Sequence, residues 1–207
     1  MKGKFITFEG CEGSGKSTQL RLFENYLKEN KIEYIYTREP GGTSISEKIR
    51  DIILDVANSE MTDECEAMLY ASSRIQHIKE KILPALSDGK LVLCDRYIDS
   101  SMAYQAYARG LGEDFVRKIN SYCFENCMPD YTVFLNISSE DAFKRKGGAD
   151  KDDRLELSGA DFHKKVYNGY LECAKKDKER FLIIDCSGTK DETHKKIVDK
   201  LKEKGVL

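Results

Sequence analysis

Short apolar runs alternate with longer segments of helical periodicity along the chain. The apolar runs are rich in β-branched and aromatic residues and have the length of buried strands. This alternation is typical of a parallel sheet with helices on its faces. We therefore predict an α/β fold, a five-stranded parallel sheet flanked by helices, with strands at Phe5–Phe8, Tyr34–Thr37, Leu91–Cys94, Thr132–Asn136 and Phe181–Asp185.

The segments between and after these strands predict helices, because their apolar residues recur at helical spacing and polar capping residues precede several of them. The predicted helices are Lys16–Asn30, Ser44–Ile53, Asp63–Leu86, Ser100–Tyr107, Glu113–Glu125, Ser139–Lys146, Ala160–Lys176 and Asp191–Lys202.

One stretch between the fourth and fifth strands lacks the residues needed for a core. Residues 144–154 combine glycines with many charged side chains and include no large apolar residue. Since helical patterns resume on both sides, a functional loop is favoured over a domain boundary. We predict a single domain over residues 1–207, with a mobile lid at about 144–156.

Composition and charge exclude several classes of function. The 207 residues are 40% hydrophobic and 34% charged, with a net charge of −2, which indicates a soluble globular protein without a basic field for nucleic acid. No apolar run has the length of a membrane span or of a signal peptide, so no membrane partner is expected. The seven cysteines include no C-x-x-C pair, which predicts reduced thiols in the cytoplasm and no zinc site.

A phosphate-binding loop follows the first predicted strand and opens the first predicted helix. Its pattern, G-x-x-x-x-G-K-[ST], is met by Gly10, Gly15, Lys16 and Ser17. In such a loop the backbone N–H groups and the helix N-terminus bind phosphate, the lysine reaches the β and γ phosphates, and the hydroxyl faces Mg²⁺. We predict that ATP binds to Gly10, Cys11, Glu12, Gly13, Ser14, Gly15, Lys16, Ser17 and Thr18.

A carboxylate for the metal is predicted at the end of the third strand. Asp95 directly follows the apolar run Leu91–Cys94. An apolar run ending in aspartate is by itself a common start of a turn, but a phosphate loop on another strand makes a metal role the better interpretation. Ser17 and Asp95 are therefore the candidate Mg²⁺ ligands.

Two other classes of phosphate-loop protein fit the chain poorly. A GTPase needs D-x-x-G and [NT]-K-x-D on separate strands, whereas here the segments resembling them, 185–188 and 189–192, are adjacent, and Glu192 stands where the second requires aspartate. A motor or helicase needs further domains for coupling. Of the activities compared, transfer of a phosphoryl group to a small molecule is the one that remains.

Candidate cations for an anionic acceptor lie near the predicted sheet edge. They are Arg38 after the second strand, Arg74 within a long helix and Arg96 after the third strand. Fixed cations beyond those on ATP are needed to hold an acceptor phosphate in line with the γ-phosphate. Two polar segments, the turn at 38–43 and the run at 95–105, follow strands at the edge where α/β proteins bind ligands.

Four motifs in this order resemble the thymidylate kinase family over nearly the whole chain. They are F-E-G-x-E-G-x-G-K-S-T at 8–18, R-E-P-G-G-T at 38–43, S-R-I-Q-H at 73–77 and D-R-Y-x-D-S-S-x-A-Y-Q at 95–105. The resemblance implies a nucleoside monophosphate kinase fold, Mg-ATP as donor, dTMP as acceptor, dTDP as product and a homodimer.

The resemblance also implies roles for individual residues. Tyr70 stands where the family more often has a phenylalanine stacked on thymine, and Glu12 is expected near the sugar 3′-hydroxyl or the metal. Gln105 offers a donor and an acceptor that match the imide edge of a pyrimidine. The implied acceptor-binding residues are Glu12, Arg38, Tyr70, Arg74, Arg96, Ser101, Tyr104 and Gln105.

The arginine that neutralises the transferred phosphoryl group is expected in the lid. The phosphate loop contains no cation except Lys16, and family members with such a loop place an arginine in the lid, which here contains Arg145 and Arg154. The expected catalytic residues are thus Lys16, Arg96, Arg145 and Arg154. Two alternatives stay open: a kinase for another small anionic acceptor such as a sugar acid, and an ATP-binding module without turnover.

Overall fold

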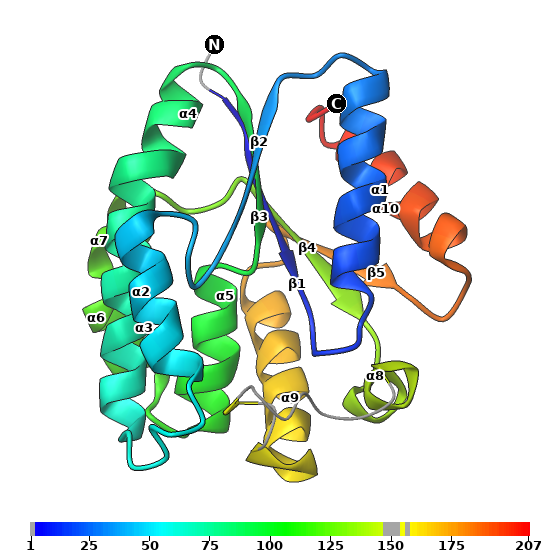
Figure 1. The fold of residues 1–207 in the computed structure, drawn as a ribbon. Helices are drawn as coiled ribbons and strands as arrows, with labels where there is room; N and C mark the ends of the chain where they lie inside the picture. Colours follow the sequence, from blue (N-terminus) through cyan, green and yellow to red (C-terminus); the bar gives the residue numbers. More distant parts are fainter. Residues whose placement is uncertain (1–2, 147–153, 156–157) are drawn as a thin grey trace.

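The computed structural model describes residues 3–146, 154–155 and 158–207. Five strands form one parallel sheet in the order β2-β3-β1-β4-β5, which confirms the predicted fold class (Figure 1). Each strand lies within one residue of its predicted bounds at either end. The strands are β1 (Phe5–Glu9), β2 (Tyr34–Arg38), β3 (Leu91–Asp95), β4 (Tyr131–Asn136) and β5 (Phe181–Asp185).

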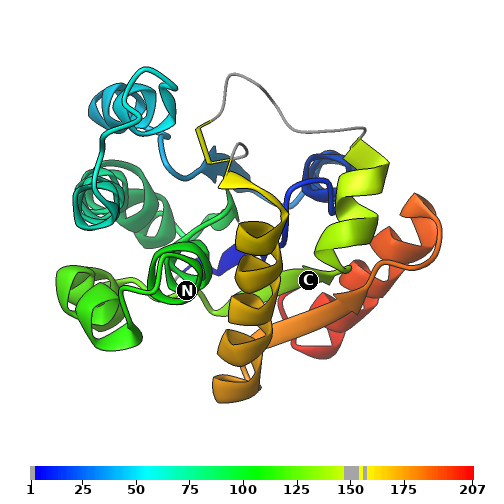
Figure 2. The same cartoon turned by 90° about the horizontal axis from the view of Figure 1, so that it is seen from below.

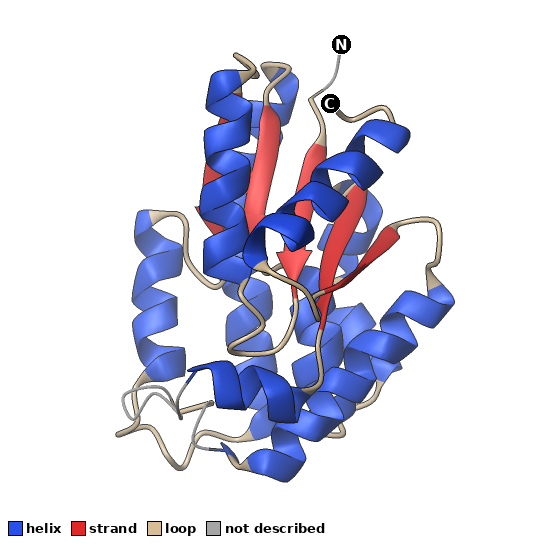
Figure 3. Ribbon diagram, turned by 90° about the vertical axis from the view of Figure 1, so that its right-hand side faces the viewer, coloured by secondary structure: helices blue, strands red, loops and turns tan. Residues whose placement is uncertain are grey.

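Helices cover both faces of the sheet (Figure 3). On one face, α1 (Lys16–Glu29) packs with α10 (Lys190–Glu203). In the view from below, α9 lies between α2 and α3 on one side and α8 and α10 on the other (Figure 2). The helical segments are α1 (Lys16–Glu29), α2 (Ser44–Leu54), α3 (Asp63–His77), η1 (Ile78–Ile82), α4 (Leu83–Ser87), α5 (Ile98–Ser101), η2 (Met102–Ala108), α6 (Glu113–Ile119), α7 (Ser121–Asn126), α8 (Ser139–Lys146), α9 (Ala160–Lys176) and α10 (Lys190–Glu203).

Three predicted helices are less regular than the sequence pattern indicates. The helix predicted over Asp63–Leu86 contains the π-helical turn η1, just before Pro84, a residue that has no N–H to donate within a helix. The helix predicted over Glu113–Glu125 is broken at Asn120, whose side chain bonds to Arg74 and to a carbonyl of its own helix. The segment predicted over Ser100–Tyr107 continues α5 into the π-helical η2.

The core forms on both faces of the sheet because alternate strand residues point to opposite sides. On β1, Phe5 packs with η1 residues such as Ile78, whereas Ile6 and Phe8 belong to the larger cluster that includes Phe23 of α1. This double burial explains why the strands are almost continuously apolar. It also holds the carboxyl ends of β1, β2 and β3 side by side at the lower end of the sheet in Figure 1.

The contact between α9 and η2 is unusually close. Gly169 of α9 faces Ala103 of η2, and a Cβ built on Gly169 would lie 2.9 Å from the Cα of Ala103. The next residue, Tyr170, is fully buried, and its hydroxyl donates to Glu9 at the carboxyl end of β1. The glycine therefore sets how near Tyr170 comes to the strand ends.

A buried ion pair joins the start of α5 to the start of β5. Arg180 donates to both carboxylate oxygens of Asp99 at 2.6 and 2.8 Å, and Thr132 donates to the same carboxylate at 2.7 Å. The Asp99 and Arg180 side chains are 3% and 12% exposed. Arg180 also donates to the more exposed Asp177 at 2.7 Å, whereas Asp99 has Arg180 as its charged partner, so the buried Asp99 carboxylate depends on Arg180 in place of water.

We expect Asp99→Ala to lower the free energy of unfolding by about 3 kcal/mol, because it removes both hydrogen bonds of Arg180 to Asp99 and leaves this largely buried guanidinium with only the 44% exposed carboxylate of Asp177. Asp199→Ala, which removes an exposed helical pair with Lys195, should cost less than about 0.5 kcal/mol. Urea denaturation of both variants and the wild type measures the difference. Equal costs for the two variants would contradict this role for the buried pair.

Candidate active site

The phosphate loop connects β1 to α1 with backbone angles that suit glycine. Gly13 and Gly15 have φ of 77° and 95°, and Gly15 caps the N-terminus of α1. Lys16 is buried and donates to the carbonyls of Gly10 and Cys11 at 3.2 and 3.5 Å. Burial, followed by the nearby Arg96 charge, lowers the pKa of the Lys16 ammonium. The loop thus holds a desolvated cation beside the N–H groups of a helix N-terminus, which is an arrangement for binding phosphate.

Arg96 stands directly after β3 and reaches the phosphate loop. It has a φ of 65°, in the left-handed region that residues other than glycine seldom adopt. Its guanidinium donates to Gly10 O at 3.1 Å and to Tyr170 Oη at 3.1 Å, and it pairs with Glu12. Because these contacts bring an arginine to the mouth of the loop, its strained backbone is consistent with a functional position.

Behind Arg96 lies the fully buried carboxyl group of Glu9. It accepts bonds from Tyr97 N at 2.7 Å, from Ser100 Oγ at 2.7 Å and from Tyr170 Oη at 2.8 Å. Burial, and next the charge of Asp99, raise the pKa of Glu9 to about 7. Since Ser100 Oγ and Tyr170 Oη also accept from Arg96, the Glu9 network holds that arginine in place.

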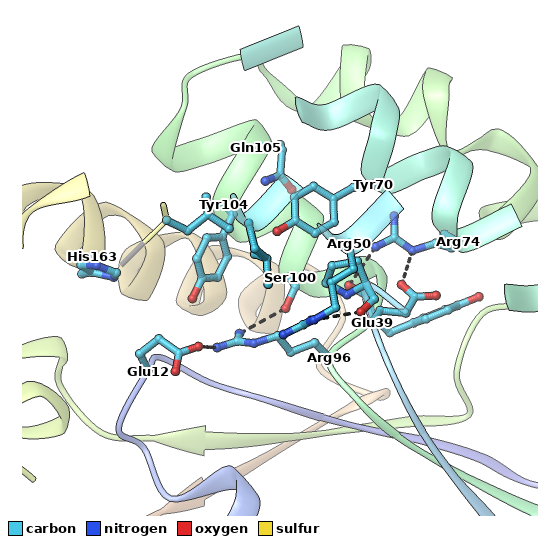
Figure 4. A pocket seen from close by; sticks show the side chains of 14 residues that line it. Glu12, Glu39, Arg50, Tyr70, Arg74, Arg96, Ser100, Tyr104, Gln105 and His163 are labelled. Carbon is cyan, nitrogen blue, oxygen red and sulfur yellow. Dashed lines mark hydrogen bonds and ion pairs between the residues drawn. The ribbon is translucent and has the colours of Figure 1, made fainter. Parts of the chain in front are cut away.

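A cavity opens beside the loop and encloses about 590 Å³ of space, part of which is open to solvent (Figure 4). Its wall begins at Glu12 and Arg96 and continues to side chains of α2, α3, η2 and α9. The lining residues are Glu12, Glu39, Pro40, Arg50, Leu54, Tyr70, Arg74, Arg96, Tyr97, Ser100, Tyr104, Gln105, Leu155 and His163.

Of the three arginines predicted for the acceptor, the structure brings Arg74 and Arg96 to this cavity. Arg74 is 1% exposed, and its guanidinium donates to Glu39 at 2.7 Å, to Asn120 at 2.6 Å and to Ser101 at 2.9 Å. These bonds fix its orientation. Arg38 is instead exposed at the carboxyl end of β2, where it pairs with Glu47 at 2.9 Å.

The aromatic and amide residues predicted to read the base also line the cavity. Tyr70 and Gln105 lie near each other at one end, and Tyr104 stands nearer the phosphate loop (Figure 4). The buried Tyr104 hydroxyl has no hydrogen-bond partner among the described residues, and burial keeps its pKa well above the ordinary value. It is therefore a neutral donor available to a ligand. Ser101 does not line the cavity, because its hydroxyl faces Arg74.

The two predicted metal ligands lie on adjacent segments of the sheet edge. Asp95 ends β3 and is paired in register with Phe8 of β1, while Ser17 is exposed in the first turn of α1. One oxygen of Asp95, Oδ1, is buried without a hydrogen-bond partner in the described part of the chain. A carboxylate and a hydroxyl are oxygen ligands that suit Mg²⁺, so the residues present fit this ion.

The predicted lid falls largely on residues 147–153 and 156–157, which lie outside the described residues. Its two arginines, which are described, lie on different sides. Arg145 of α8 donates to Cys186 O at 2.8 Å and lines a second hollow with Asn136, Tyr167 and Asp185. Arg154 donates to Ile53 O at 3.0 Å and to Glu66 at 2.5 Å, on the side of α2 and α3.

Sequence reasoning missed several residues of the cavity wall. Glu39 and Pro40 belong to the recognised turn at 38–43, and Ser100 adjoins the predicted Ser101, so these three were within reach of the motifs. Arg50, which donates to Pro40 O at 3.0 Å, carries no such signal, since its direction depends on how α2 packs. The other missed residues are Leu54, Tyr97, Leu155 and His163.

Comparison with known proteins agrees with this geometry. The family model described as thymidylate kinase matches residues 8–197. The chain belongs to the thymidylate kinase family. It is 48% identical to the thymidylate kinase of Clostridium novyi (strain NT) over 203 residues, covering 97% of this chain and 99% of that protein. It is 47% identical to that of Finegoldia magna (strain ATCC 29328 / DSM 20472 / WAL 2508), covering 98% and 100%.

Membership of this family makes the chain a phosphotransferase of the nucleoside monophosphate kinase class with ATP as phosphate donor. This confirms the enzyme class and the donor expected from the motifs. Among the described residues, no helix combines the length and apolar character needed to cross a membrane.

The titration of Glu9 predicts a pH-dependent contribution to stability. The folded protein has a Glu9 pKa of about 7 against an ordinary value of 4.5, so between these pH values it holds a proton that the unfolded chain has released. This contribution is fully present below pH 4.5 and is lost as the pH rises through 7.

We expect the stability of the wild type relative to Glu9→Gln to fall by roughly 1–3 kcal/mol between pH 5 and pH 8, because glutamine keeps the hydrogen-bonding shape without titrating. Urea denaturation of both unliganded proteins at several pH values measures this difference. A difference that stays constant with pH would show that Glu9 does not titrate in this range.

Proposed function

We propose that this enzyme transfers the γ-phosphate of ATP to dTMP, giving ADP and dTDP for dTTP biosynthesis in the cytoplasm. The observation that carries the proposal is the continuous cavity that starts at the phosphate loop, at Glu12 and Arg96, and ends at Tyr70 and Gln105. It offers cations at one end and an aromatic ring with an amide at the other, which matches a pyrimidine nucleoside monophosphate. The seven cysteines are all free thiols, in keeping with a reducing compartment.

On the donor side, the phosphates of ATP bind to the loop Gly10–Thr18 and to the N-terminus of α1. Lys16 exchanges its contacts with the Gly10 and Cys11 carbonyls for the β and γ phosphates. The buried Ser14 hydroxyl, which lacks a hydrogen-bond partner among the described residues, is a further donor for phosphate.

Asp95 and Ser17 are the residues that would hold Mg²⁺, an ion that commonly binds to one or two protein ligands when a nucleotide is present. When bound, the ion neutralises charge on the β and γ phosphates. The unpartnered Asp95 Oδ1 supports this assignment, since a buried carboxylate oxygen requires a ligand or donor.

On the acceptor side, Arg96 binds the phosphate of dTMP, and its position beside Gly10 places that phosphate next to the γ-phosphate. Arg74 and Arg50 add cations to the wall, and Arg38 lies close by at the end of β2. Tyr70 stacks on the base, Gln105 reads its imide edge, and the free donor of Tyr104 faces the sugar with Glu12. Ser101 supports this side indirectly through Arg74.

The reaction needs positioning and charge neutralisation more than a strong base, since the acceptor phosphate is already ionised. The cations at the loop supply the charge neutralisation. His163, the only histidine among the described lining residues, therefore needs no catalytic role. A sugar acid kinase has no use for the Tyr70 and Gln105 end of the cavity. A module without turnover has no use for the combination of Lys16, Ser17 and Asp95.

A coupled assay for ADP release tests the proposal with dTMP, dUMP, dCMP, AMP, GMP and gluconate as acceptors. We expect dTMP to give the highest kcat/KM, and Lys16→Ala to lower kcat with dTMP by roughly a hundredfold or more, because it removes a charge-assisted contact with the transferred group. Thermal unfolding verifies that the variant is folded. ADP release with none of the acceptors would favour a module without turnover.

Of the two expected lid arginines, Arg145 is the better candidate for the ATP side. The hollow that it lines begins at Asn136, at the end of the strand that pairs with β1. Arg154 is engaged with Ile53 O and Glu66, on the acceptor side. A catalytic role for Arg154 therefore requires that it leave these partners.

We expect Arg145→Ala to lower kcat by roughly tenfold or more with little change in the KM for dTMP, because arginine neutralises charge that develops in the transition state. Arg154→Ala should mainly change the kinetics of the acceptor. Steady-state kinetics of both variants and of the double variant separate the roles. Wild-type kcat in all three at saturating substrates would show that neither arginine is catalytic.

A homodimer, which the family resemblance implies, has a suitable surface on α2 and α3. Five large apolar side chains on these neighbouring helices and the turn after α2 are 37–51% exposed: Ile45, Ile52, Val56, Met68 and Ile75. Such a concentration of exposed apolar surface is typical of an interface. We therefore place the contact between two copies on this α2–α3 face.

We expect the wild type to sediment at twice the chain mass of 23.6 kDa and Ile52→Glu to sediment as a monomer, since a carboxylate in the apolar contact is poorly solvated. Ile183→Glu, at a similarly exposed position on β5, is the matched control and should remain dimeric. Sedimentation equilibrium distinguishes these states. A monomeric wild type would rule out the homodimer.

A further inference from the structure

A buried carboxylate lies next to the cavity, at Glu66 of α3. Its side chain is 1% exposed and is shared by three partners. Gln105 Nε2 donates to Oε1 at 2.9 Å, while Arg109 and Arg154 donate to Oε2 at 3.0 and 2.5 Å. The arginines come from the end of η2 and from beyond α8, so Glu66 gathers distant parts of the chain at one point.

Glu66 Oε2 accepts from two guanidinium groups and so forms two ion pairs, and a paired carboxylate acts only as a hydrogen-bond acceptor. Gln105 must therefore turn its NH₂ group toward Glu66. The opposite orientation would bring the amide oxygen against a carboxylate oxygen and remove the 2.9 Å bond. Glu66 thus determines which end of the Gln105 amide is the donor and which is the acceptor.

The amide so oriented lines the cavity beside Tyr70 (Figure 4). In the described part of the chain, no group donates to Gln105 Oε1, although the Gln105 side chain is 2% exposed overall. This oxygen is consequently an acceptor for a ligand. The hydrogen-bonding edge of the site then has a fixed order of donor and acceptor.

This order matters because the edges of thymine and cytosine are inverse. Thymine presents an N–H donor at N3 and an acceptor at C4, whereas cytosine presents an acceptor at N3 and an NH₂ donor at C4. A glutamine free to rotate its amide by 180° can bind either base, but one held in a single orientation binds only one without an unmatched polar pair.

We propose that Glu66, held by Arg109 and Arg154, is a specificity-determining positioning residue that fixes the Gln105 amide to accept from N3–H of the base. This rests on the proposed function, in which Gln105 reads the base. Glu66 acts through Gln105 and not on the reacting atoms.

The test compares kcat/KM for dTMP with kcat/KM for 5-methyl-dCMP, two nucleotides that share the methyl group and differ only at the edge Gln105 faces. Glu66→Gln provides an amide that can either donate or accept, so both orientations of Gln105 become available. We expect the dTMP to 5-methyl-dCMP ratio to fall by roughly tenfold or more. A purely structural loss lowers both values together and leaves the ratio unchanged.

A second variant guards against misfolding caused by the two buried arginines. Glu66→Asp keeps the negative charge between them but draws the carboxylate back from Gln105 by one methylene group, and it should also lower the ratio. Asp63→Asn is the matched control, because Asp63 pairs with the same Arg109 at 3.2 Å while its side chain is 44% exposed. It should keep the wild-type ratio. Thermal unfolding verifies the fold of each variant.

The outcomes separate the two claims. A wild type that phosphorylates neither nucleotide contradicts the proposed function. A wild type that prefers dTMP, with an unchanged ratio in folded Glu66→Gln or, if that variant does not fold, in Glu66→Asp, overturns the role of Glu66 alone. A lowered ratio in the Asp63→Asn control would equally overturn it, since the effect would then not be specific to the carboxylate that orients Gln105.

Discussion

The placement of Arg96 by the buried Glu9 carboxyl group is the constraint on which the rest of the site depends. Arg96 has a φ of 65°, and the cost of that backbone is offset by bonds to Gly10 O, Ser100 Oγ and Tyr170 Oη. Glu9 bonds to the same serine and tyrosine hydroxyls. A single network of hydrogen bonds therefore sets the distance between the phosphate loop and the acceptor cavity.

The same principle recurs at the far end of the cavity, where buried carboxylates orient the side chains that face it. Glu39 bonds to Arg74 and His77, and Glu66 bonds to Gln105. A buried carboxyl group held by several donors is costly to rearrange, so the groups bound to it lose rotational freedom. The cavity wall is preorganised by a layer of acids that scarcely touches solvent.

The sequence predicted the fold class, the five strands and the phosphate loop because each depends on residues close together in the chain. It predicted less well which residues line the cavity, because the direction in which a side chain points depends on tertiary packing. As residue types, Arg38 and Arg50 are equally suited to bind a phosphate. Only Arg50 lines the cavity, because its position on α2 places it there. Ser100 and Ser101 are neighbours on one helix, where about 100° of rotation separates successive side chains, so one faces the cavity and the other faces Arg74.

Because Gly169 has no side chain, α9 and η2 can approach closely, and this approach determines the positions of the polar groups around Glu9 and Arg96. A methyl group there would press on the Ala103 backbone from 2.9 Å, and the two helices would have to part. Tyr170, the next residue, would then move away from Glu9 and Arg96. A side chain at this buried position is thus excluded on steric grounds, because the spacing of the two helix backbones determines the distances within the whole network.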